Sequence, residues 1–144
     1  MAKLPLEDEQ YRELLSFRVA LRRFLRWSDA QAVAAGLTAQ QHQLLLAIRG
    51  HDGQTAPTVG EVAESLLLKH HSVVELVDRT EAAGFVKRVI DGDDRRVVRL
   101  SLTRSGNRVL EHLSANHLEE LARLAPIVGR LARGLDDESS TAKP

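Results

Sequence analysis

Residues 58–102 constrain the fold of this chain more than any other stretch, because two helical patterns are followed there by two strand-like patterns. Thr58 and Glu61 have the spacing of a capping box, in which each side chain accepts a hydrogen bond from the backbone N–H of the other residue. From Val59 to Leu66, apolar residues recur at intervals of three and four. This segment is therefore predicted to be a short helix with one apolar face.

A second helix is predicted after a break near Leu68 and Lys69, because the same apolar spacing returns from Val73 to Thr80. Gly84 has the position of the glycine that commonly ends a helix in a left-handed conformation. The opposite side of this helix is polar, and it carries His71, Ser72, Glu75 and Arg79.

The second helix is followed by two segments with the composition of β-strands. Residues 85–90 and 97–102 are rich in β-branched and aromatic side chains. The segment between them, 91–96, opens with Asp-Gly, which is a strong hairpin signal. We therefore predict an antiparallel hairpin whose turn carries two adjacent arginines, Arg95 and Arg96.

Further helices are predicted before this region. Residues 7–35 have one apolar face, and Gly36 is placed to end that helix. Thr38 and Gln41 form another capping box, which opens a helix that is expected to run to Arg49.

Residues 103–135 carry an apolar stripe that is too long for a small chain to cover by itself. We infer that this helical region packs on the first helix and on the same helices of a second copy. Pro126 should kink or restart the helix, because proline lacks an N–H and clashes with the preceding turn. Segments 1–6 and 136–144 are expected to be loose tails. The predicted dimerisation residues are Leu110, Leu113, His117, Leu121, Leu124, Val128 and Leu131.

Short motifs occur in a fixed order through most of the chain: Leu37-Thr38, Val62-Ala63, Leu76-Val77-Asp78-Arg79, Gly84-Phe85-Val86, Arg88, Asp91, Asp94-Arg95-Arg96, Leu102-Thr103 and Gly106. Together they resemble the multiple-antibiotic-resistance regulator (MarR) family, most densely between residues 37 and 106. Three residues depart from the pattern. Leu67 stands where a glycine usually connects the helices, Lys69 where Ser or Thr commonly opens the recognition helix, and Thr80 where an apolar residue is usual.

The resemblance implies a mainly α fold with a small β-hairpin wing, that is, a winged helix-turn-helix with N- and C-terminal dimerisation helices. The expected organisation is one domain over residues 1–144. Its dimerisation helices would span about 7–35 and 103–135, and its DNA-binding lobe about 38–102.

The order helix, helix, hairpin also suits contact with duplex DNA. An α-helix fits the major groove of B-DNA, and arginines on a slender hairpin can reach phosphates or the minor groove. Asp94 is expected to brace one of the two wing arginines through a charge-assisted hydrogen bond. The predicted DNA-binding residues are Lys69, His70, His71, Ser72, Glu75, Arg79, Arg95 and Arg96.

The charge distribution is compatible with that expectation. The chain has 20 basic and 20 acidic residues, so it is not basic over its whole surface. Residues 69–108, however, include nine basic and six acidic residues, whereas residues 1–13 are mostly acidic among their charged positions. Such asymmetry favours one DNA-facing side and one solvent-facing side.

Several classes of protein are excluded by what the sequence lacks. The absence of cysteine rules out structural disulfides and thiol-based metal or redox sites. No nucleophile-elbow, phosphate-loop or dinucleotide-binding motif is present, so we expect neither an enzyme nor a cofactor. No apolar run approaches the roughly 18 residues of a membrane span, and no signal sequence is recognisable, which favours the cytoplasm without membrane association.

Six histidines raise the possibility of a metal site. His112 and His117 are five positions apart, which on a helix separates them by about 140°, and the adjacent His70 and His71 also diverge. We therefore expect no metal site, and interpret His117 as a core or interface residue.

These patterns favour a homodimeric transcriptional regulator that binds a pseudo-palindromic operator and represses nearby genes. Proteins that this chain resembles often release DNA when a small aromatic or anionic effector binds between the dimerisation helices and the DNA-binding lobe. Trp27 is a candidate to contact such an effector, although a core position is the simpler interpretation. Two alternatives remain open: a winged-helix module that binds partner proteins, and a regulator that responds to a metal through histidine.

Overall fold

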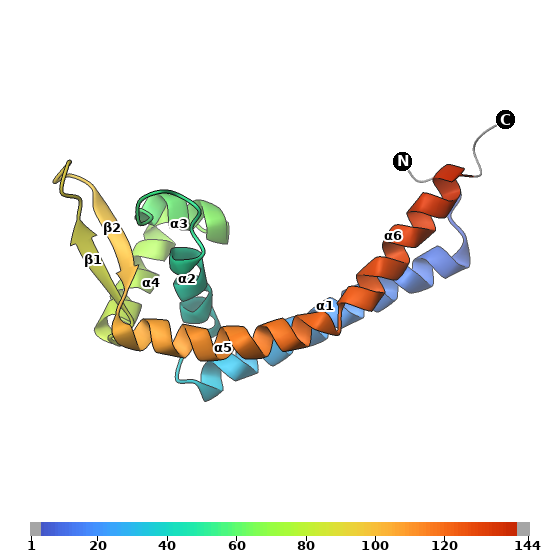
Figure 1. The fold of residues 1–144 in the computed structure, drawn as a ribbon, viewed down its shortest axis with the longest axis horizontal. Helices are drawn as coiled ribbons and strands as arrows, with labels where there is room; N and C mark the ends of the chain where they lie inside the picture. The colour runs from blue at the N-terminus through green and yellow to red at the C-terminus, as the bar shows by residue number, and fades with distance from the viewer. Residues whose placement is uncertain (1–3, 141–144) are drawn as a thin grey trace. The chain divides into compact units, whose positions relative to one another are not determined.

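The computed structural model describes residues 4–140, and within them it contains six helices and one two-stranded antiparallel sheet (Figure 1). This architecture confirms the predicted mainly α fold with a hairpin wing. The elements are α1 (Asp8–Ala34), α2 (Ala39–Arg49), α3 (Val59–Leu66), α4 (His70–Ala82), β1 (Val86–Ile90), β2 (Val98–Leu102), α5 (Arg104–Ala122) and α6 (Ala125–Ser140).

The described chain divides into two compact units. One contains residues 29–115, and the other contains residues 4–28 together with 116–140. The first is called the winged-helix unit below, and the second the terminal-helix unit.

Local sequence signals set the helix boundaries of the winged-helix unit. Thr58 and Glu61 form both hydrogen bonds of the predicted capping box at the start of α3, and the corresponding pair at the start of α2 does the same. Gly36 and Gly84 follow the ends of α1 and α4 with φ of +87° and +86°, a conformation that glycine adopts without steric cost. The predicted helix starts and stops are therefore confirmed at these positions.

The core of the winged-helix unit lies between its three short helices, the hairpin and α5. Its fully buried side chains come from every one of these elements, and they include Leu44, Leu45, Val62, Val73, Leu76, Val77, Val86, Leu100, Leu110 and Leu113. Leu110 and Leu113 were predicted to be dimerisation residues, but they are only 3% and 1% exposed. They belong to this core and offer no free surface to a second copy. The apolar stripe of α5 was identified, but its first part is covered by the chain itself.

The hairpin is attached to the segment before α3. Val86 pairs with Leu102 and Ile90 with Val98 in the antiparallel register. The Leu100 N–H donates to the Pro57 carbonyl at 2.8 Å, and an isolated bridge joins Thr58 to Arg99. The wing therefore has a third, very short backbone partner on the β2 side.

The terminal-helix unit pairs the first part of α1 with the end of α5 and with α6. α5 ends at Ala122 and α6 begins at Ala125, so Pro126 lies in the first turn of a new helix, as the sequence predicted. α6 extends to Ser140, although a loose tail was expected from Asp136, because no proline or glycine interrupts this segment. The other expected tail residues, 1–3 and 141–144, lie outside the described residues.

Many large apolar side chains of this unit face solvent. Leu14, Leu25, Leu121 and Val128 are 46%, 51%, 42% and 49% exposed, respectively. None of the described side chains in this unit is fully buried. No helix in the described part of the chain is long and apolar enough to cross a membrane.

Candidate nucleic-acid interface

α4 presents a polar face opposite its buried one. Val73, Leu76, Val77 and Thr80 point into the core, while His71, Glu75 and Arg79 are exposed and Ser72 is half-buried. Thr80 is buried where an apolar residue is usual. Its hydroxyl donates to the Leu76 carbonyl at 2.7 Å, so this buried hydroxyl is satisfied. The helix thus exposes three of the side chains predicted to contact DNA and leaves a fourth, Ser72, half-buried.

The start of α4 differs from that of α2 and α3. Lys69 is the N-cap residue, and its side chain makes no capping hydrogen bond. Lys69 and His70 are both exposed. The first backbone N–H groups of the helix therefore lack the side-chain acceptor that Ser or Thr would supply.

The turn before Lys69 contains an unusual backbone conformation. Leu67 has φ 54° and ψ 39°, in the left-handed helical region, and its side chain is 91% exposed. A left-handed conformation costs a residue with a Cβ about 1–2 kcal/mol. The structure therefore keeps the helix-turn-helix geometry without the usual glycine, at the cost of local strain.

Arg88 connects the wing to α4. Its guanidinium donates to Asp78 at 2.6 Å and to Glu81 at 2.7 Å, and its backbone N–H donates to Glu81 at 3.1 Å. Partial burial lowers the pKa of Arg88, but the hydrogen bonds to both carboxylates outweigh that effect and raise it overall. Arg88 belongs to the family motif in the sequence, but no local pattern there marks its contacts with α4.

Asp91 and Arg99 form a second link at the base of the wing turn. Arg99 Nε donates to Asp91 Oδ2 at 2.5 Å, and Arg99 Nη1 donates to the Ala56 carbonyl at 2.8 Å. The other oxygen of Asp91 accepts from the N–H groups of Asp93 and Asp94. The hydrogen bond from Arg99, followed by those two N–H groups, lowers the pKa of Asp91 below its ordinary value.

At the wing tip, Asp94 holds the side chain of Arg96 but not that of Arg95. The two carboxylate oxygens of Asp94 accept from Nε and Nη2 of Arg96, each at 3.1 Å, and Oδ1 also accepts the Arg96 N–H at 3.0 Å. These hydrogen bonds lower the pKa of Asp94 and raise that of Arg96. Arg95 is exposed and, within residues 4–134, forms no hydrogen bond or ion pair. The acidic residues of the turn therefore orient Arg96 and not Arg95.

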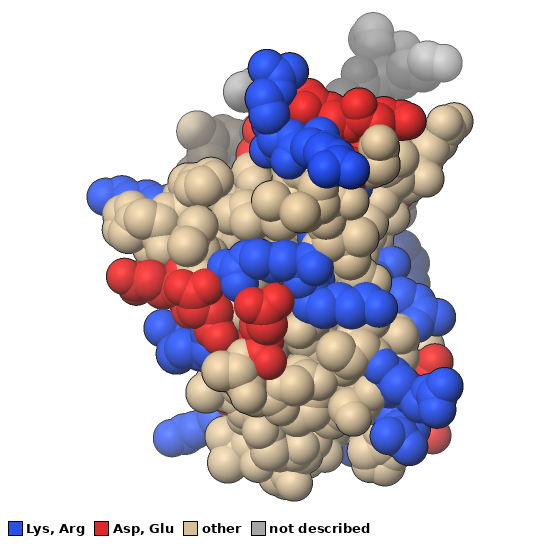
Figure 2. Space-filling model, turned by 90° about the vertical axis from the view of Figure 1, so that its left-hand side faces the viewer, with Lys and Arg blue, Asp and Glu red and all other residues tan. Residues whose placement is uncertain are grey.

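Figure 2 shows the charged side chains on the side of the molecule that carries the wing. Lys and Arg side chains lie at the top of this view and in a band across its middle, with smaller groups of Asp and Glu beside them. Neutral surface separates the basic groups. The surface is therefore locally basic and not uniformly so.

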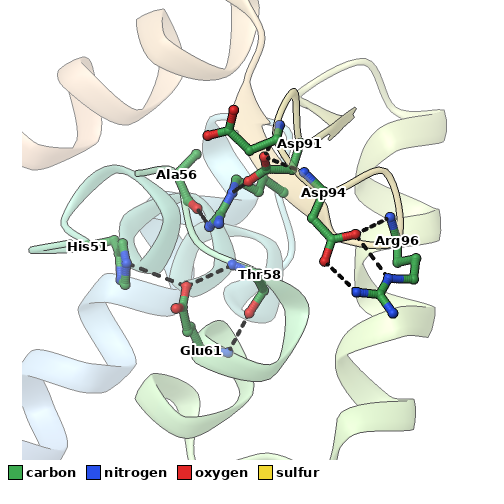
Figure 3. Close-up of polar contacts among 9 residues, drawn as sticks. His51, Ala56, Thr58, Glu61, Asp91, Asp94 and Arg96 are labelled. Atoms are coloured by element: carbon green, nitrogen blue, oxygen red, sulfur yellow. Dashed lines mark hydrogen bonds and ion pairs between the residues drawn. The ribbon is translucent and has the colours of Figure 1, made fainter. Parts of the chain in front are cut away.

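A histidine that sequence analysis did not select lies beside the start of α3 (Figure 3). His51 Nε2 is 3.5 Å from Glu61 Oε2, the same oxygen that accepts the Thr58 N–H at 2.9 Å. Its loop position, with no periodic pattern around it, gave no signal in the sequence. The contact adds to the capping box that begins the helix-turn-helix.

The remaining predicted residues lie in the terminal-helix unit. His117 accepts from or donates to the Ser28 hydroxyl through Nε2 at 2.7 Å, and its ring lies 4.8 Å from that of Trp27 and 5.9 Å from that of Phe24. Leu121 and Val128 are exposed, while Leu124 and Leu131 are half-buried. Among the described residues, no group of three His, Asp or Glu side chains is arranged to hold a metal ion.

Comparison with known proteins places these elements in context. A family model described as the MarR family matches residues 35–97. The transcriptional repressor MdtR of Bacillus subtilis is 29% identical over 121 residues, which cover 75% of this chain and 76% of MdtR.

Solved structures share the fold. The structure of the S. aureus MepR–DNA complex superposes with a TM-score of 0.68 at 20% identity, covering 88% of this chain and 96% of MepR. CouR from Rhodococcus jostii bound to p-coumaroyl-CoA gives a TM-score of 0.66 at 25% identity, covering 85% of this chain and 86% of CouR.

Proposed function

We propose that the chain belongs to the MarR family of winged helix-turn-helix, DNA-binding transcriptional regulators, and that it is a homodimeric repressor of a pseudo-palindromic operator. Members of this family are regulators and not enzymes. We further propose that the protein acts in the cytoplasm and that its two compact units work together as one MarR-like domain.

One observation supports the mode of DNA binding most directly. Arg88 joins the wing to α4, so the recognition helix and the hairpin are held together as one surface. On that surface His71, Ser72 and Glu75 are assigned to base edges, and Lys69, His70 and Arg79 to the backbone. Arg95 and Arg96 are assigned to a phosphate or the minor groove. The MepR–DNA complex supports this assignment through the shared fold.

Exposed leucines of the terminal-helix unit support a homodimer. This unit has no fully buried described side chain, and it exposes Leu14, Leu25, Leu121 and Val128. An apolar surface of this kind is stabilised when a second copy covers it. A two-fold dimer would present two recognition helices, and half-sites one helical turn of DNA apart would match them.

A small aromatic or anionic effector is proposed to release the protein from DNA. CouR, with its bound p-coumaroyl-CoA, supports the existence of such ligands among similar proteins. Trp27 is retained as a candidate contact, because its ring lies with Phe24 and His117 in an aromatic cluster that is only half-buried. An effector acts if its affinity for the DNA-bound and free states differs.

Selection of bound sites from random duplex DNA tests the function. The expected result is a pseudo-palindromic consensus whose binding weakens steeply with salt, because phosphate contacts release counterions. Ser72→Ala and Glu75→Ala should change the selected bases, since each good base contact contributes about 1–3 kcal/mol of discrimination. Salt-independent binding, or no enriched site, would instead favour the protein-interaction module. Loss of operator binding on adding a chelator would favour the metal-responsive alternative.

A further inference from the structure

The wing carries an exposed apolar pair that none of the contacts above uses. Ile90 of β1 and Val98 of β2 lie directly opposite each other in the hairpin register. Ile90 is 64% exposed and Val98 is 36% exposed. Each is the residue of its strand nearest to the turn, so the pair lies close to the arginine-bearing tip.

Strand alternation fixes the face on which this pair lies. Side chains two residues apart along a strand share a face of the sheet. Ile90 therefore shares its face with Val86, which is buried, and with Arg88, which reaches the carboxylates of α4. Val98 shares the same face with the buried Leu100. The apolar pair thus continues the inner face of the wing beyond the core, on the side that Arg88 connects to α4.

The wing and α4 carry cationic side chains that face solvent. Arg95 and Arg96 lie beyond the pair in the turn, exposed Lys69 is the N-cap residue of α4, and exposed Arg79 lies on α4. Four of the carboxylates on these elements are bonded to arginines: Asp78 and Glu81 to Arg88, Asp91 to Arg99, and Asp94 to Arg96. In the described part of the chain, neither Lys69 nor Arg79 forms an ion pair. A partner that covers Ile90 and Val98 must therefore offer negative charge and an apolar surface side by side. Duplex DNA has both, because each phosphate is followed by the C–H edges of a deoxyribose.

We propose that Ile90 and Val98 pack against deoxyribose groups of duplex DNA where the backbone passes between the wing and α4. This inference rests on the proposed DNA binding and adds to it a contact that is independent of charge. The pair would contribute affinity through burial of apolar surface, whereas the wing arginines contribute through counterion release.

Strand propensity is a competing explanation for β-branched residues on an exposed hairpin. Threonine separates the two explanations, because it keeps the β-branch while it replaces apolar atoms with a hydroxyl. Val89 provides a matched control. It lies on β1 next to Ile90, is 44% exposed, and points to the opposite face of the hairpin.

The test measures operator affinity as a function of salt for Ile90→Thr/Val98→Thr, for each single variant, for Val89→Thr and for Arg96→Ala. We expect the double variant to bind about tenfold more weakly, equivalent to about 1.4 kcal/mol. Its slope of log affinity against log salt should remain that of the wild type, because no phosphate contact is lost. Val89→Thr should change neither quantity, and Arg96→Ala should lower the slope.

A second measurement is hydroxyl-radical footprinting, which reports the accessibility of deoxyribose C–H groups. Wild-type protein and Val89→Thr should protect the sugars beside each half-site, and Ile90→Thr or Val98→Thr should lose that protection locally. Each single variant retains one of the two apolar residues. If circular dichroism shows that the double variant is unfolded, the single variants take its place in the test.

Either of two outcomes would overturn this inference and leave the proposed DNA binding standing. One is unchanged affinity and footprint in the Ile90 and Val98 variants while Arg96→Ala still weakens binding. The other is an equal loss of affinity in Val89→Thr, which would assign the effect to hairpin stability. Failure of the wild-type protein to bind any selected duplex would instead overturn the proposed function and this inference together.

Discussion

Glu81 and Arg88 are joined twice, once through the backbone N–H of Arg88 at 3.1 Å and once through its guanidinium at 2.7 Å. The same guanidinium also reaches Asp78 at 2.6 Å. Two carboxylates of the recognition helix therefore set the position of the first wing strand. The orientation of the wing is a property of α4 as much as of the hairpin.

Replacement of Arg88 by alanine should weaken DNA binding although Arg88 is assigned no DNA contact. Loss of a partly exposed ion-pair network is expected to lower the free energy of unfolding by about 1 kcal/mol, measured by urea denaturation. Operator affinity should fall further than that of Lys87→Ala, a control on the neighbouring exposed lysine. Equal affinity in Arg88→Ala and wild type would show that the wing is positioned by other contacts.

The wing arginines should act mainly through charge. Replacing Arg95 and Arg96 by alanine should weaken binding to all sequences and lower the salt slope by up to about two units, near 0.9 for each lost phosphate contact. Asp94→Ala should also weaken binding, because Arg96 then loses the carboxylate that restricts its rotamers. Tighter binding by Asp94→Ala in a fluorescence titration would mean that Asp94 only repels phosphate.

The contact between Asp91 and Arg99 should make the free energy of unfolding depend on pH only at acidic pH. The pKa of Asp91 in the folded protein lies below its ordinary value of 3.8, mainly because Arg99 donates to it. A depressed pKa contributes stability that is fully present above the ordinary value and disappears as pH falls through the folded value. The difference in urea midpoint between wild type and Asp91→Asn should therefore be constant above about pH 5 and shrink below about pH 4. A difference that persists unchanged at low pH would contradict the assignment.

Leu67→Gly should stabilise the protein. The left-handed conformation of Leu67 costs about 1–2 kcal/mol, and glycine removes that cost while it adds about 0.5–1 kcal/mol of chain entropy to the unfolded state. Little packing is lost, because the side chain is 91% exposed. Leu67→Ala is the control, since alanine keeps the Cβ and the strain. If both variants have the same unfolding free energy, strain at this turn is not significant.

Dimerisation should depend on the exposed Leu121 and the half-buried Leu124 of the terminal-helix unit. Leu121→Glu combined with Leu124→Glu should give monomer or unfolded chain in light scattering, because two charges would enter the apolar face. Glu119→Ala, an exposed and polar position nearby, should leave the dimer intact. A dimeric double variant that binds the operator normally would place the interface elsewhere.

Features governed by neighbouring residues could be predicted from the sequence. The capping boxes at Thr38 and Thr58 and the terminating Gly84 involve residues within a few positions of one another, so their patterns identify them. Helical periodicity also identified the apolar stripe of α5. It could not show that Leu110 and Leu113 are covered by the chain's own core, because periodicity defines a face and not its partner.

Contacts between distant segments could not be predicted. Arg99 reaches the Ala56 carbonyl across 43 positions, and no local pattern marks that pairing. Likewise, the adjacent arginines of the turn look equivalent in sequence, and only the folded turn distinguishes Arg96, held by Asp94, from Arg95. Leu67 shows a further limit. The sequence shows that a leucine replaces the usual glycine, but only the structure shows that the left-handed conformation is kept there.

The two halves of α4 carry side chains with different contacts, and this difference affects which substitutions the helix can accept. The side chains that anchor the wing, Asp78 and Glu81, lie in the second half of the helix, while His71 and Glu75 lie in the first half and, in the described part of the chain, bond to no other side chain. Mutations at the first positions therefore leave the contacts of the fold untouched. If His71 and Glu75 contact bases as proposed, substitutions at these two positions would change the operator that is recognised and leave the hydrogen bonds that hold the wing intact.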